Sequence, residues 1–180
     1  MKAAFFILKG FLIALVIIVG FILQTSVFTG IALAGVVPNI MIILTATLGF
    51  MRGQKTGAMS GLFCGLLVDT YAGYYFGTYA LIYMLLGFLS GLFNRIYYGD
   101  SIRLPLLVVS VMDLLYGSAV FIFLFFIRHR TDFVFYFLNI MMPEMVYTVV
   151  VTLFVYVAMY RFNIFLDSLD IDRRGTRRIA

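Results

Sequence analysis

Residues 10–51 read GFLIALVIIVGFILQTSVFTGIALAGVVPNIMIILTATLGFM, and this stretch contains no charged side chain. A helix needs about 20 apolar residues to cross a bilayer, so the stretch is long enough for two spans. Thr29-Gly30 and Gly35 provide a turn near its middle. It is also far longer than the roughly 7 to 15 apolar residues of a secretory signal. The stretch therefore predicts two membrane helices, over about 5–28 and 38–51.

The composition of the whole chain also indicates a membrane protein. Of its 180 residues, 64% are hydrophobic and 12% are charged, and the mean hydropathy is +1.10. These values lie outside the range of soluble domains, and about six spans would use most of the length. We expect an all-α, polytopic membrane protein with six transmembrane helices in a compact bundle. Its transmembrane domain covers residues 1–165, and a basic cytoplasmic tail covers 166–180.

Four further apolar segments follow Arg52 and Lys55. The third segment of the chain starts near Gly57 and meets Asp69 after too few residues to cross the bilayer at about 1.5 Å each. Asp69 therefore lies inside the membrane, or the helix breaks there. The remaining segments extend over about 75–93, 104–127 and 135–160, and charged or polar loops separate them.

The distribution of basic residues predicts the orientation of the spans. With six spans and a cytoplasmic N-terminus, Arg128 and Arg130 face outward and the other lysines and arginines face the cytoplasm. Both termini are then cytoplasmic. Nucleic-acid binding is not expected, because aspartates precede the basic tail and would repel phosphate. The residues expected to fix the topology and to contact anionic lipid are Arg52, Lys55, Arg173, Arg174, Arg177 and Arg178.

Three carboxyl side chains interrupt the apolar segments, namely Asp69, Asp113 and Glu144. A carboxylate in hydrocarbon is costly, so each marks either a polar site or a packing device. In the predicted topology these side chains lie in the outer half of the membrane or near its midplane, as does Asn39. We therefore predict an outward-facing polar pocket formed by Asn39, Asp69, Asp113 and Glu144.

Two explanations remain open for how these carboxyls are neutralised. Either Arg128 or Arg130 reaches Asp69 or Glu144, or the buried carboxyls are protonated and donate hydrogen bonds. A structural role is the alternative to a pocket. In that case each carboxyl caps a broken helix end or satisfies a neighbouring group.

Glycines recur every four residues in the third and fourth segments, where they place small groups on one helix face. Such a face serves packing inside one chain, contact with a partner helix, or contact with a second copy of the chain. The glycines concerned are Gly57, Gly61, Gly65, Gly87 and Gly91.

Few residues are suited to catalysis or metal binding. Cys64 is the single cysteine and lies in an apolar run, and His129 is the single histidine and lies between two arginines. A serine nucleophile needs a base such as histidine to activate it. The chain also has no cluster of cysteine and histidine with metal-ligand spacing. We therefore expect neither an enzyme nor a bound metal or cofactor.

Several motifs resemble the rod shape-determining MreD family. They are Pro38-Asn39-Ile40 at the start of a span, Gly49-Phe50-Met51-Arg52-Gly53 at its end, and the segment from Gly57 to Asp69 followed by Gly77. The resemblance implies a noncatalytic inner-membrane subunit of the bacterial wall-elongation machinery. It also implies direct binding to the bitopic protein MreC, with MreB, RodA and a penicillin-binding transpeptidase in the wider complex. The family fold is similar to that of the substrate-binding subunits of energy-coupling-factor vitamin transporters, with six helices around an outward-facing pocket.

Two functional hypotheses follow. In the first, the chain is a scaffold that binds MreC through small-residue and Phe-rich surfaces and regulates peptidoglycan synthesis without turnover. In the second, it is the substrate-binding membrane subunit of a small-molecule, vitamin-type importer, and the four pocket residues line the site. The resemblance favours the scaffold, because fold similarity does not transfer a ligand.

Overall fold

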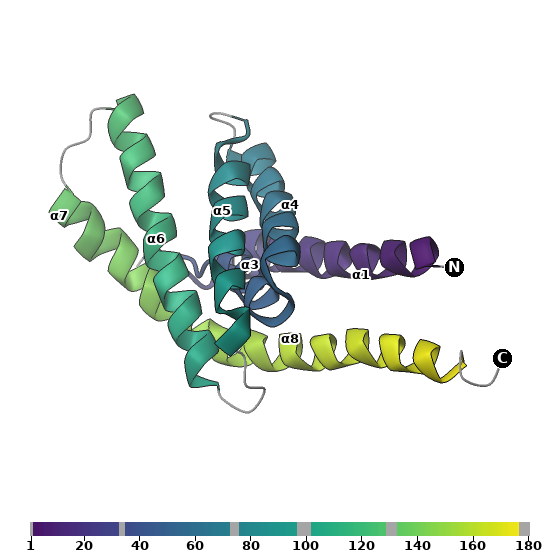
Figure 1. The fold of residues 1–180 in the computed structure, drawn as a ribbon. Coiled ribbons are helices and arrows are strands. Elements are labelled where there is room, and N and C mark those ends of the chain that lie inside the picture. The colour runs from purple at the N-terminus through teal and green to yellow at the C-terminus, as the bar shows by residue number, and fades with distance from the viewer. Residues whose placement is uncertain (1, 33–34, 73–75, 97–101, 129–132, 177–180) are drawn as a thin grey trace.

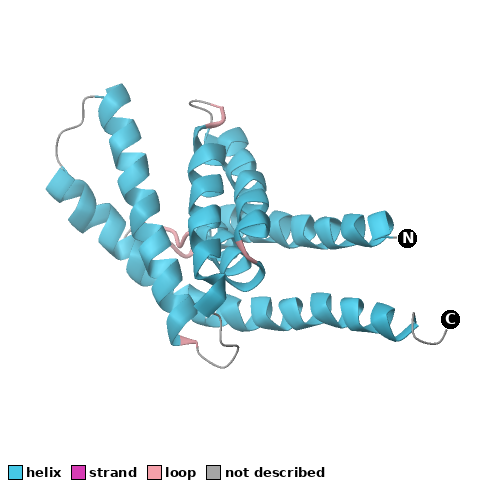
Figure 2. Cartoon of the chain, viewed as in Figure 1, coloured by secondary structure: helices cyan, strands magenta, loops and turns pink. Residues whose placement is uncertain are grey.

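The computed structural model describes residues 2–32, 35–72, 76–96, 102–128 and 133–176, which form helices joined by short turns (Figures 1 and 2). No strand occurs among these residues, so the predicted all-α fold is confirmed. The longer helices are α1 (Lys2–Ile22), α3 (Ile40–Arg52), α4 (Gln54–Ala72), α5 (Thr78–Leu92), α6 (Arg103–Arg128) and α8 (Met142–Thr176). The short helical elements are η1 (Leu23–Val27), α2 (Phe28–Gly30), η2 (Phe93–Ile96), α7 (Phe133–Tyr136) and η3 (Phe137–Met141).

The centre of the fold is α3. Its residues from Ile40 to Met51 are all buried, because α1, α4, α5, α6 and α8 contact it. The sequence of α3 is apolar on every face apart from Thr45 and Thr47, as expected for a helix buried on all sides. At 13 residues, α3 is about 20 Å long, shorter than the roughly 30 Å hydrocarbon core. Its N-terminus therefore needs hydrogen-bond partners from the protein itself.

Helices α4 and α5 pack against each other more extensively than any other pair, and glycines permit this. A Cβ atom added to Gly57, Gly61 or Gly65 of α4 would collide with the backbone of α5. A Cβ atom added to Gly87 of α5 would collide with the backbone of Gly57 in the first turn of α4. One added to Gly91 would collide with the backbone at the start of α4. The structure therefore places all five glycines at one contact inside the chain, where they let the two backbones approach closely.

The segment from Phe133 to Thr176 is helical but irregular at its start. Pro143 lacks the N–H group that would bond to the carbonyl of Asn139, and the π-helical turn η3 ends just before it. Helix α8 then continues to Thr176, so the predicted boundary between residues 165 and 166 falls inside a helix. Leu166 is fully buried, and the carboxylate of Asp167 lies 2.8 Å from the guanidinium of Arg52. These contacts attach the C-terminal part of α8 to the end of α3.

Four helical segments among the described residues are long and apolar enough to cross a membrane: Ile7–Gly30, Thr78–Ile96, Arg103–Phe123 and Phe133–Ser168. The second and third predicted spans correspond to α3, which is shorter, and to α4, which carries several polar side chains. In Figure 1, the axes of α4, α5 and α6 are roughly aligned, with α5 antiparallel to the other two, whereas α1 and the C-terminal part of α8 extend at a steep angle to them, toward the side where both termini lie. The count of six spans is therefore not confirmed and stays a prediction.

Several of the basic residues that predict the orientation lie wholly or partly outside the described residues. His129, Arg130, Arg177 and Arg178 lie outside the described residues. The backbones of Arg128, Arg173 and Arg174 belong to described helices, but their side chains are outside the description. The cytoplasmic placement of the termini and the pairing of a carboxyl with Arg128 or Arg130 stay predictions.

Candidate functional site

The N-terminus of α3 is the structural origin of the polar site. The first four N–H groups of a helix have no partner inside the helix, and in an apolar environment each must be satisfied by the protein. The Met41 N–H donates to Oε1 of Gln24 at 3.1 Å, and the Ile42 N–H donates to Oδ1 of Asn39 at 3.1 Å. The other two N–H groups donate to backbone carbonyls just before the helix. The buried end of α3 is therefore fully capped.

Asn39 connects this helix end to two other helices. Its Oδ1 also accepts a hydrogen bond from the Tyr83 hydroxyl of α5 at 2.9 Å. Its Nδ2 donates to Oε1 of Glu144 at 3.4 Å, and its backbone N–H donates to Oγ1 of Thr148 at 3.1 Å. Glu144 and Thr148 both belong to α8 and lie four residues apart, which places them on one helix face. One asparagine therefore joins α3, α5 and α8.

Asp113 brings α6 into the same site. Its side chain is buried, and its carboxyl lies within reach of the hydroxyl of Thr148. Oδ1 of Asp113 has no hydrogen-bond partner among the described residues. Tyr116, three residues further along α6, packs against Tyr83, and the two ring centroids are 5.1 Å apart. We call Asn39, Tyr83, Asp113, Tyr116, Glu144 and Thr148 the polar cluster.

Asp69 lies apart from the polar cluster and caps α5. Helix α5 begins after Gly77, whose φ of 99° favours glycine and whose position provides no side-chain cap. The carboxylate of Asp69 supplies the cap from α4, because its oxygens accept hydrogen bonds from Tyr79 N–H at 3.0 Å and Ala80 N–H at 2.9 Å. The structure thus assembles Asn39, Asp113 and Glu144 of the four predicted pocket residues and leaves Asp69 elsewhere.

Removing the Asp69 cap should destabilise the start of α5. In Asp69→Ala, two N–H groups lose their acceptors, and we expect a loss of about 2 kcal/mol in the free energy of unfolding. Asp69→Asn retains one acceptor oxygen and should lose about half as much. Unfolding of the detergent-solubilised protein, followed by helix content in increasing denaturant, would measure both. Equal stability of Asp69→Ala and the unmodified protein would contradict the capping role.

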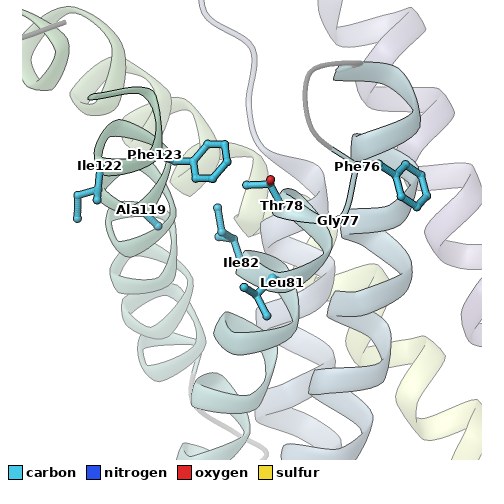
Figure 3. Close-up of a pocket in the computed structure, with 8 residues that line it drawn as sticks. All are labelled: Phe76, Gly77, Thr78, Leu81, Ile82, Ala119, Ile122 and Phe123. Atoms are coloured by element: carbon cyan, nitrogen blue, oxygen red, sulfur yellow. The ribbon is translucent and has the colours of Figure 1, made fainter. Parts of the chain in front are cut away.

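An apolar groove lies between the start of α5 and the C-terminal half of α6 (Figure 3). Its volume is about 630 Å³. Figure 3 shows Ala119 and Phe123 of α6 opposite Thr78 and Ile82 of α5. None of the four predicted pocket residues lines this groove, so the predicted outward-facing polar pocket is not confirmed. The lining residues are Phe76, Gly77, Thr78, Leu81, Ile82, Ala119, Ile122 and Phe123.

Sequence reasoning missed Gln24, Tyr83, Tyr116 and Thr148. Two signals were available in the sequence. Gln24 is the one amide inside the first predicted span, and Thr148 follows Glu144 by four residues, so the two share a helix face. Nothing in the sequence distinguished Tyr83 and Tyr116 from the other tyrosines, because their role depends on how α5 meets α6.

The described residues offer little for catalysis. They contain no group of three His, Cys, Asp or Glu side chains arranged to hold a metal ion. Cys64 is buried, and the hydroxyls of Ser60 and Ser90 donate to carbonyls of their own helices. The fold and the site together define a helical membrane protein with a largely buried polar cluster and an apolar groove.

Comparison with protein families identifies the family to which this membrane protein belongs. The family model of the rod shape-determining protein MreD matches residues 5–165, so the chain belongs to the MreD family. The resemblance found in the sequence is confirmed, and the chain has a role in rod shape determination. Comparisons with curated proteins and with solved structures find no match.

Proposed function

We propose that the chain is a noncatalytic scaffold in the bacterial inner membrane that binds MreC and so regulates peptidoglycan synthesis. Its termini face the cytoplasm, and MreB, RodA and a penicillin-binding transpeptidase belong to the wider complex. The observation that carries this proposal is the apolar groove between α5 and α6. The groove has the shape and chemistry to receive a partner helix.

The walls of the groove suit a helix from another membrane protein. They are apolar apart from the hydroxyl of Thr78. A helix inserts side chains spaced three and four residues apart into such a groove, and in lipid this association depends on close packing. The predicted topology places this end of α5 and α6 on the outer side. We therefore assign the groove to the transmembrane segment of MreC or to the residues that follow it outside.

The glycine faces are less suited to a partner or to a second copy of the chain. The glycines of α4 and α5 are engaged with each other, so a partner would have to displace a helix to reach them. At the groove, by contrast, Phe76, Leu81 and Ile122 expose between 54% and 76% of their surface. Large exposed apolar side chains of this kind are available for packing.

The importer hypothesis has less support. Asn39, Asp113 and Glu144 belong to the polar cluster, where Asn39 bonds directly to Glu144 and to Thr148, and Asp69 caps α5. A small-molecule site needs a few polar groups that point into a cavity and orient the ligand. The groove of this chain supplies only the Thr78 hydroxyl for that purpose.

Filling the groove should weaken MreC binding without disturbing the fold. Ala119→Phe adds a ring between α6 and α5, and we expect roughly tenfold less MreC to co-purify, which corresponds to about 1.4 kcal/mol. Val111→Phe is the matched control, because Val111 lies on the same helix, is 41% exposed and is not part of the groove. Equal MreC recovery with both stable variants would contradict the assignment.

A further inference from the structure

The polar cluster contains two carboxyls and no basic side chain. Asp113 of α6 and Glu144 of α8 are bridged through Thr148 and Asn39. Asp113 interacts with Thr148, and Glu144 interacts with Asn39 and with Asp113. None of these groups carries a positive charge. Arg52, which lies at the opposite end of α3, is paired with Asp167. Among the described side chains, the cluster therefore has an excess of negative charge.

The directions of the hydrogen bonds show which carboxyl is left unsatisfied. Oδ1 of Asn39 accepts from Ile42 N–H and from Tyr83, so its Nδ2 must be the group that faces Glu144. The Thr148 hydroxyl accepts from the Asn39 N–H, which leaves its own hydrogen for Asp113. Oδ1 of Asp113 then has no partner among the described residues, although the side chain is only 5% exposed.

The N-terminus of α3 compensates only part of this charge. A helix N-terminus is equivalent to roughly half a positive charge, and here it lies beside Glu144 through Asn39. Ionisation of both the buried Asp113 and the part-buried Glu144 exceeds that compensation, and an uncompensated buried charge is costly. We propose that the Asp113–Glu144 pair is a proton-binding site, which holds one proton at neutral pH with Oδ1 of Asp113 as the atom placed to take it.

A proton fits this donor set better than a metal ion does. A sodium or calcium ion needs several oxygen ligands, but Oδ1 of Asn39 and Oγ1 of Thr148 already accept hydrogen bonds. A proton needs a single lone pair. The other titratable side chains that the structure describes around the cluster are not basic; they are Tyr79, Tyr83, Tyr116, Tyr136 and Cys64.

Loss of the proton would place two negative charges on opposite sides of the contact between α6 and α8. At a pH where ordinary carboxyls are ionised but the native site still holds its proton, the native protein binds one more proton than the unfolded chain. Stability falls with rising pH when the native state binds the extra proton. The folding equilibrium constant should therefore fall about tenfold per pH unit until the native site also loses its proton.

Infrared spectroscopy of the purified protein tests the site directly. A protonated carboxyl has a C=O absorption separate from that of a carboxylate. We expect the unmodified protein in detergent to show this band at neutral pH and to lose it at high pH. Asp113→Asn should remove the band, whereas Asp69→Asn should leave it unchanged. The same measurements in choline chloride and in sodium chloride should agree.

Two results would overturn the proposal. The first is an unmodified protein without a protonated carboxyl at neutral pH, a result that does not depend on whether any variant folds. The second is a band that sodium chloride abolishes, since the site would then take a sodium ion in place of the proton. A stability that falls with pH in the unmodified protein and in Asp69→Asn, but not in Asp113→Asn, would support it.

Discussion

Gly61→Leu is expected to leave little folded protein. A Cβ atom at position 61 would collide with the carbonyl of Tyr83, which belongs to the backbone of α5. The backbone cannot give way there alone, because Gly57 and Gly65 make equally close contacts one turn on either side. Overpacking costs about 1–3 kcal/mol where side chains can adjust, and more where they cannot. We therefore expect a loss of about 4 kcal/mol, measured by denaturant unfolding in detergent.

Gly10→Leu is the matched control for this effect. Gly10 is also inside a helix, but a Cβ atom added there meets nothing within 4 Å. We expect Gly10→Leu to unfold at the same denaturant concentration as the unmodified protein. If Gly61→Leu were as stable as Gly10→Leu, the close contact between α4 and α5 would be contradicted. If Gly61→Leu failed to bind MreC, the cause would be the lost packing between α4 and α5, and not the loss of a surface that contacts MreC.

The features that could be predicted from the sequence are those set by local patterns. The apolar run over 10–51 is too long for one span and contains a Gly-rich turn, so the helices on either side followed from length alone. The four-residue glycine spacing identified the close-packing faces of α4 and α5, because that spacing returns to one side of a helix. The sequence did not distinguish packing inside the chain from packing against a partner.

The arrangement of the polar residues could not be predicted, because it depends on rotation about the helix axes. Counting residues from a helix end gives the depth of a side chain in the membrane but not the direction in which it points. Asp69 and Glu144 were placed at similar depth, yet one caps α5 and the other bonds to Asn39. Helix α8 also continues to Thr176, beyond the predicted span over 135–160, because a polar sequence that ends a membrane span does not end a helix.

Asn39→Ala should be the most damaging substitution in the polar cluster. It removes the acceptor for the Ile42 N–H and for the Tyr83 hydroxyl, and it removes the donor to Glu144. A lost helix cap costs about 1 kcal/mol, and each buried polar group left unsatisfied costs about 1–3 kcal/mol. We expect a total loss of about 3–5 kcal/mol in the free energy of unfolding. Denaturant unfolding with helix content as the signal would measure it.

Two further variants separate the roles of this side chain. Asn139 is an exposed asparagine that bonds only to the Phe135 carbonyl of its own helical segment in the hydrogen bonds described, so Asn139→Ala should change stability by less than about 0.5 kcal/mol. Asn39→Asp keeps an acceptor for Ile42 and Tyr83 but sets a second carboxyl against Glu144. We expect it to lose stability as the pH rises and the new carboxyl ionises. If Asn39→Ala matched Asn139→Ala, Asn39 would not be the residue that joins α3, α5 and α8.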